Sequence, residues 1–210
     1  KITYAFYPLH TEPEVTLSVY SSAYVNQIET VRLISRNLPV GMYLLVKEHP
    51  CSIGKRPLSY YKKLLDIPNV LLINPAVVSR DIIRHAALIS VTAGSIGFEG
   101  MIFNKPVITL GGAPYNFLPR SMIRHVTCPM RLGEEICDLL NGYEHKEKAL
   151  RSFIAAVIEN SIPVDFYSRL LQRPEAYNKA LHHSGLKEDI IRAEHYNRLA
   201  GYLIHRIIND

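Results

Sequence analysis

The chain has 210 residues, of which 48% are hydrophobic and 20% are charged, and this balance is that of a globular protein with room for one large domain or one and a half. Its net charge of +5 and pI of about 9.1 suit an anionic partner, but the basic residues are scattered and no nucleic-acid motif is visible, so we expect no nucleic acid among its partners. No apolar run reaches the roughly 18 residues that a membrane-spanning helix needs.

The chain begins with KITYAFYPLH, which has neither an initiator methionine nor the pattern of a signal peptide. It starts directly with a predicted strand, and we therefore expect the chain to be a piece of a longer protein. The three cysteines Cys51, Cys128 and Cys137 have no CxxC spacing. They favour free thiols in a reducing cytosol over a disulfide framework or a zinc site.

Short apolar runs alternate with helical patterns through the first part of the chain. The apolar runs predict strands at residues 2–6, 43–47, 70–74, 88–92, 106–110 and 125–129. The periodic segments predict helices at residues 23–38, 58–66, 79–86, 95–104 and 132–141. Because several strands are apolar throughout, the pattern indicates an α/β fold, a Rossmann-like parallel sheet with helices on both faces, at residues 1–142.

The strand signal stops after about residue 143. Residues 144–161 read as one helix, the segment 165–185 is interrupted by Pro174, and 186–210 reads as a long terminal helix. We expect residues 143–210 to form a helical carboxyl-terminal extension that packs on the first domain.

In parallel sheets, ligands bind beyond the carboxyl ends of the strands, and "TAGSIGFEG" (92–100) stands at such an end. Gly94 allows a tight turn, Ser95 can cap the following helix, and the free N–H groups there favour an anion. Gly97 allows close approach of a ligand or another backbone, and Glu99, about one turn further on, can accept a ribose diol. The competing interpretation is a serine cap, packing glycines and a solvated glutamate.

Two further strand ends carry polar residues. In "KEHP", His49 and Pro50 close an apolar strand, so the imidazole is predicted to reach the same crevice and donate to a phosphate oxygen. In "YPLHTEPE", His10 and Glu12 lie in a proline-rich loop after the first strand and are candidates for a substrate loop. An exposed structural histidine and a plain surface loop are the alternatives.

Other catalytic signatures are missing from the sequence. No pair of histidines has the spacing of a metal site, and we expect no metal. There is no GxSxG elbow, no Walker lysine motif and no complete GxGxxG fingerprint.

The segment "VKEHP", followed by "TAGSIGFEGMIFNKPVITLG", resembles the capsule polysaccharide biosynthesis family of bacterial glycosyltransferases, which includes Kdo transferases. The resemblance covers about residues 1–125. It implies one half of a GT-B fold, the carboxyl-terminal domain that binds the sugar nucleotide. On that resemblance, His49 and Pro50 form the His-Pro motif and Ser95 the Ser/Thr motif that hold the nucleotide phosphate, and Glu99 matches a glutamate that binds ribose hydroxyls.

The resemblance also implies a role and partners. His49 would stabilise the leaving phosphate, the substrate would be a nucleotide sugar (CMP-linked favoured over UDP-linked), and no cofactor is expected. The acceptor would be a saccharide or lipid-linked, an amino-terminal GT-B domain would lie outside this chain, and the protein would work in the cytoplasm or peripherally at the inner face of the membrane. The alternatives are an epimerase or polyol-phosphate transferase of related fold, and a non-catalytic Rossmann-like partner domain.

Overall fold

The computed structural model describes residues 2–161 and residue 201. The chain divides into two compact units, Lys1–Ile154 and Ala155–Asp210. The predicted helical segments at 165–185 and 186–210 lie, apart from Gly201, outside the described residues. Among the helices that are described, none combines the length and apolar character needed to cross a bilayer.

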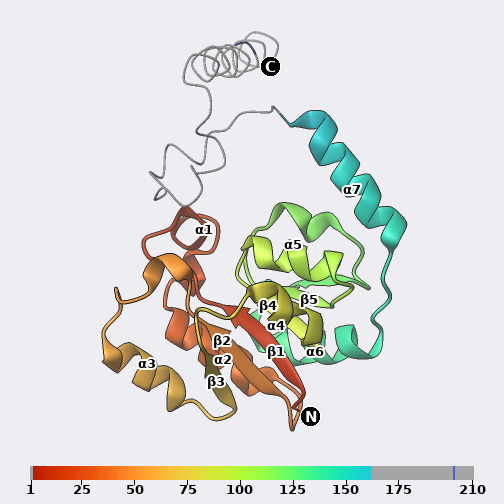
Figure 1. Cartoon of the computed structure of the whole chain (residues 1–210). Helices are drawn as coiled ribbons and strands as arrows, with labels where there is room; N and C mark the ends of the chain where they lie inside the picture. The colour runs from red at the N-terminus through yellow and green to blue at the C-terminus, as the bar shows by residue number, and fades with distance from the viewer. Residues whose placement is uncertain (1, 162–200, 202–210) are drawn as a thin grey trace. The chain divides into compact units, whose positions relative to one another are not determined.

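The first unit is built on one six-stranded sheet in which every strand is parallel to its neighbours (Figure 1). Its strands are β1 (Tyr4–Pro8), β2 (Tyr43–Lys47), β3 (Val70–Ile73), β4 (Leu88–Val91), β5 (Val107–Thr109) and β6 (Ile123–His125). Their order across the sheet is β3-β2-β1-β4-β5-β6. This confirms the predicted Rossmann-like fold, and it places the point at which the strand order reverses between β1 and β4.

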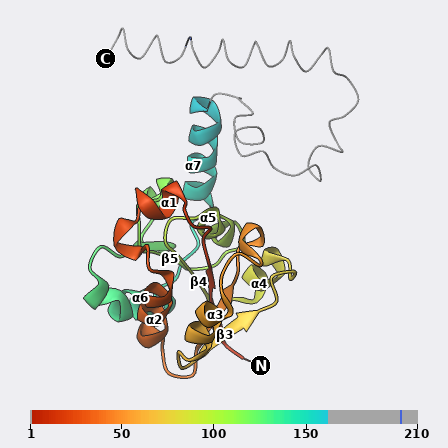
Figure 2. The same ribbon diagram turned by 90° about the vertical axis from the view of Figure 1, so that its left-hand side faces the viewer.

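Helices pack on both faces of this sheet, and the described residues also include helices outside these two layers. The helices are α1 (Val15–Ser18), α2 (Gln27–Asn37), α3 (Leu58–Leu65), α4 (Ser79–His85), α5 (Ser95–Ile102), α6 (Leu132–Asn141) and α7 (Glu147–Asn160). Figure 2 shows α2 and α6 on one side of the strands and α4 on the other. Short 3₁₀ turns stand at Ser22–Tyr24, Pro50–Ser52, Pro114–Phe117 and Pro129–Arg131.

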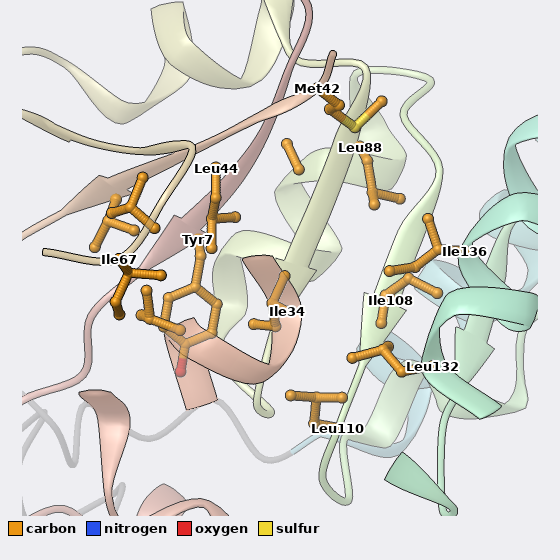
Figure 3. Packing of buried hydrophobic residues seen from close by; sticks show 14 of the residues in the cluster. Tyr7, Ile34, Met42, Leu44, Ile67, Leu88, Ile108, Leu110, Leu132 and Ile136 are labelled. Atoms are coloured by element: carbon orange, nitrogen blue, oxygen red, sulfur yellow. The ribbon is translucent and has the colours of Figure 1, made fainter. Parts of the chain in front are cut away.

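Successive strand residues point to opposite faces of the sheet and pack into two separate apolar cores. Tyr7 and Leu44 lie in the core shared with α2, α3 and α6, which Figure 3 shows around Ile34 and Ile136. Phe6 points to the other face, where the core is shared with α4, α5 and the first part of α7. Burial on both faces explains why these strands read as continuous apolar runs rather than as alternating ones.

Three local predictions need correction. The helix predicted from residue 23 begins at Gln27, because the Asn26 side chain caps it by accepting from the Glu29 amide at 3.3 Å. The sixth strand lies at Ile123–His125 rather than at 125–129, since its pairing with β5 ends at His125. Ser79 does not cap α4: the cap residue is Val78.

Candidate functional site

A pocket of about 200 Å³ lies at the switch point of the sheet. Four segments line it: residues 8–10 with Glu14 after β1, residues 47–50 at the end of β2, Ser79 at the start of α4, and residues 94–96 after β4. The predicted site residues His49, Pro50, Gly94 and Ser95 therefore meet in one pocket, as the parallel sheet requires of strands that end at one edge.

His49 enters this pocket in a defined orientation. It caps the 3₁₀ turn Pro50–Ser52, and its Nδ1 accepts a hydrogen bond from the Cys51 amide at 3.2 Å. In the neutral ring the proton is thereby assigned to Nε2, which remains free to donate. Burial lowers the pKa of His49, while the neighbouring carboxylates of Glu14 and Glu48 act in the opposite direction.

Lys47 supplies the positive charge of the pocket. The residue is 5% exposed, and its Nζ donates to the Ser79 hydroxyl at 3.0 Å. Within the described residues no carboxylate lies within ion-pair distance of this ammonium. Burial without a counter-charge lowers the pKa of Lys47 and is costly unless an anion joins it.

The neighbouring acid, Glu48, does not compensate Lys47 because it is already paired. Its carboxylate accepts from the Tyr61 hydroxyl at 2.8 Å and from the His49 amide at 2.7 Å. The Arg56 guanidinium lies 3.6 Å from the same carboxylate, and both side chains are almost fully buried. The negative charge of Glu48 is thus balanced by Arg56, which leaves the charge of Lys47 directed at the pocket.

The start of α5 forms the facing wall. Gly94, not Ser95, is the cap residue, and Ser95 is the exposed first residue of the helix, with no side-chain capping bond. The sequence prediction of a serine cap is therefore wrong, and the Ser95 hydroxyl is not used by the helix. The first turn of a helix also presents unpaired N–H groups and the positive end of the helix dipole.

His10 and Glu14 belong to the pocket as well, from the loop after β1. His10 Nδ1 lies 3.1 Å from a carboxylate oxygen of Glu14, and its Nε2 lies 2.7 Å from the Thr92 hydroxyl. The hydrogen bond from His10 lowers the pKa of Glu14, so that this carboxylate stays charged. Glu14 is the acid of the pocket that no arginine or lysine neutralises within the described residues.

Three predicted residues do not line the pocket. Gly97 is buried, and a Cβ there would come within 2.5 Å of the Tyr115 hydroxyl, so this glycine serves packing between α5 and the turn at Pro114–Phe117. Glu99 lies further along α5 and is half-buried. Glu12 contacts Gln27 and Arg56 instead of the pocket.

Sequence reasoning missed Lys47, Ser79 and Arg56, and it included Glu14 only as a member of the polar loop after the first strand. A lysine that closes the otherwise apolar strand "YLLVK" is a signal that could have identified Lys47, because a charged residue there must face the strand-end crevice. Ser79 reads as a helix cap and Glu14 as one polar loop residue among several. Arg56, between Lys55 and Pro57, looks like a surface residue, and nothing in its neighbourhood of the sequence predicts its burial.

A family model described as capsule polysaccharide biosynthesis protein matches residues 4–119, more than half of the chain. No curated protein matches the sequence. Solved structures do match, at low identity, and three of them serve here for comparison.

The spinosyn rhamnosyltransferase SpnG, complexed with spinosyn aglycone, is 13% identical with a TM-score of 0.51 over 75% of this chain and 44% of that one. A beta Kdo 2,7 transferase, KpsC of Thermosulfurimonas dismutans, is 18% identical with a TM-score of 0.48 over 76% and 55%. MnaA of S. aureus, solved with UDP, is 14% identical with a TM-score of 0.47 over 75% and 44%. The chain spans about half the length of these proteins, and at such identities the likeness concerns the fold.

Proposed function

The chain belongs to the capsule polysaccharide biosynthesis protein family, and from this premise we propose that it is the donor-binding domain of a bacterial surface-polysaccharide glycosyltransferase. The substrate we assign to the pocket is a nucleotide sugar, CMP-linked rather than UDP-linked. The single observation that carries the proposal is Lys47, which is 5% exposed, has no counter-charge among the described residues and lines the same pocket as His49 and Ser95. An anionic phosphate completes this set of groups.

Each group has a part in holding the phosphate. Lys47 contributes charge, His49 donates from Nε2, and Ser95 offers its hydroxyl together with the N–H groups of the α5 start. As the bond to the sugar breaks, negative charge grows on the nucleotide phosphate, and these donors stabilise it without rearranging. His49 is thereby the residue to which we assign the catalytic contribution of this domain.

The charged carboxylate of Glu14 would repel a phosphate, and we assign to it a sugar hydroxyl of the ligand. Glu99 stays the predicted acceptor for the ribose hydroxyls, one turn beyond Ser95. The pocket, at about 200 Å³, is smaller than the roughly 300–1,000 Å³ of most small-molecule sites. This size suits the phosphate region of the donor, with the remainder covered by an amino-terminal GT-B domain outside this chain that also supplies the acceptor site. We also propose that the transfer takes place in the cytoplasm, at the inner face of the membrane, and that its acceptor is a saccharide or is lipid-linked.

The test is a calorimetric titration of the full 210-residue chain with CMP, UDP and inorganic phosphate, repeated with Lys47→Met. We expect CMP to bind more tightly than UDP, and the variant to lose on the order of tenfold or more in affinity, the scale of a hydrogen bond to a charged group. Because Met removes a buried charge without a partner, the free energy of unfolding of the ligand-free variant should be unchanged or higher.

Lys62→Met is the matched control, since Lys62 is an exposed lysine on α3 and away from the pocket. Its affinity should equal that of the unaltered chain. If no nucleotide binds, the domain is a non-catalytic Rossmann-like module. Tighter binding of UDP than of CMP would transfer the assignment to a UDP-sugar enzyme such as an epimerase.

A further inference from the structure

His10 uses both of its ring nitrogens inside the protein. Nδ1 is 3.1 Å from Glu14 and Nε2 is 2.7 Å from the Thr92 hydroxyl. Since the Glu14 carboxylate can only accept, Nδ1 carries the proton and Nε2 accepts from Thr92. Thr92 is fully buried and His10 is 6% exposed. With both nitrogens occupied, His10 has no ring donor left for a ligand, although it lines the pocket.

The ring lies directly against the turn that leads into α5. A Cβ added to Gly94 would be 3.1 Å from His10 Cε1. This is shorter than an ordinary van der Waals contact, so the His10 ring or the turn would have to move. Thr92, the partner of the ring, stands two residues before this glycine. On the other side the Tyr115 hydroxyl donates to the Gly94 carbonyl. The turn is thus fixed from both sides, by His10 and by Tyr115.

The backbone of His10 is itself anchored. Its amide donates to the Gln27 side chain at 2.7 Å, and its carbonyl accepts from the Gln27 amide group at 3.1 Å and from Arg56. Arg56 stacks on the Tyr60 ring, 4.6 Å from its centroid, and neighbours Glu48, which in turn holds the His49 amide. A continuous buried network therefore joins the β1 loop to the segment that presents His49.

We propose that His10 is a positioning residue that fixes the Gly94–Ser95 turn relative to His49, and so sets the spacing between the two walls of the pocket. It acts through Thr92 and through contact with the Gly94 backbone, and it does not touch the phosphate. The consequence for binding rests on the proposed function, whereas the structural coupling between positions 10 and 94 does not.

A double-mutant cycle of His10→Ala and Gly94→Ala in the full chain tests this coupling. Gly94→Ala alone should lower CMP affinity about tenfold, because its methyl group displaces the ring and the turn. In the His10→Ala background the same change should cost less than about threefold, since the obstructing ring is gone. The free energy of unfolding, measured without ligand, should show the same non-additivity. Gly112→Ala is the control, because a Cβ there meets nothing closer than 3.9 Å.

Thr92 separates positioning from direct contact. Thr92→Val removes the hydroxyl at nearly constant volume and should lower CMP affinity several-fold, although Thr92 is fully buried and cannot touch the ligand. Thr92→Ser keeps the hydroxyl and should restore affinity. In ligand-free protein, the ¹⁵N shifts of His10 should show a protonated Nδ1 and an unprotonated Nε2.

Additive unfolding energies at positions 10 and 94, or a protonated Nε2 with a bare Nδ1, would overturn the inference. These two readouts need no nucleotide, so they decide the role of His10 even where the proposed function fails. Conversely, coupled unfolding energies together with no response to CMP would sustain the positioning of the turn and reject the assignment of its ligand.

Discussion

At the scale of single residues, the tautomer and burial of His49 decide how the pocket responds to pH. In the free protein, burial lowers the pKa of His49 below its ordinary value near 6.5. A bound phosphate favours the charged imidazolium and raises that pKa, so binding takes up a proton. Affinity for CMP should therefore increase as the pH falls from 8 toward 6, measured by titration at each pH.

His49→Asn is the matched variant for this prediction, because an asparagine oxygen can still accept from the Cys51 amide and cap the turn. The titration of the ligand itself is common to both proteins, so the difference between their pH profiles belongs to His49. In the absence of ligand, the pKa of His49 is lower in the folded protein than in the unfolded chain. As the pH falls, the unfolded chain therefore binds a proton at His49 before the folded protein does, and this favours unfolding. The stability of the unaltered protein should then fall below about pH 6.5 more steeply than that of His49→Asn. Parallel profiles would contradict this role.

At the scale of elements, α5 can approach the sheet and the turn at Pro114–Phe117 because it carries no side chain at Gly97. A Cβ there would lie 2.5 Å from the Tyr115 hydroxyl and 2.9 Å from Val91. We expect Gly97→Ala to lower the free energy of unfolding by about 1–3 kcal/mol, the usual cost of overpacking a filled core. Urea denaturation measures the change, with the midpoint shifting and the slope constant.

Tyr115→Phe in the Gly97→Ala background identifies the source of the cost. Tyr115→Phe removes the hydroxyl, which is the atom nearest to a Cβ at position 97. We therefore expect Tyr115→Phe to lower the free energy of unfolding by less in the Gly97→Ala background than in the unaltered chain. Equal costs in the two backgrounds would show that the helix moves as a whole and that Tyr115 does not limit it.

The same elements show how much the sequence could predict. The predicted strand "YLLVK" at residues 43–47 and the predicted helix at 132–141 agree with β2 and α6. Both are recognisable in the sequence because buried positions carry apolar residues at the spacing of a strand or a helix. The edge strand β6 has only three residues, two of which, Arg124 and His125, are polar and half-buried, so its pattern was too weak to fix its bounds. The convergence of His49 and Ser95 followed from parallel strand ends. The pairing of Lys47 with Ser79 and of Arg56 with Glu48 depends on side-chain packing across the fold, which a linear pattern does not contain.

At the scale of the whole molecule, the chain is one Rossmann-like half of a GT-B fold and spans 44% to 55% of the compared proteins. We expect the 210-residue chain to bind CMP and yet to transfer no sugar, because the groups that line its pocket are those that we assign to the donor phosphate. Assays with CMP-Kdo, CMP-sialic acid and UDP-sugars check this, with CMP binding in the same preparation as the control for folding. Turnover by this chain alone would place an acceptor site within it.

The central position of β1 has a consequence for how the protein folds. Ala5 pairs with Leu44 of β2 on one side and with Leu88 of β4 on the other. Both edges of β1 therefore remain unpaired until these later parts of the chain have been synthesised. Closing such long loops costs entropy before any contact repays it, and sheets of this kind form slowly. Until β4 arrives, the nascent chain exposes an apolar strand edge that invites aggregation. The pocket between β1 and β4 therefore lies at a junction that forms only after Leu88–Val91 have been synthesised, and a ligand that spans it would favour the closed sheet.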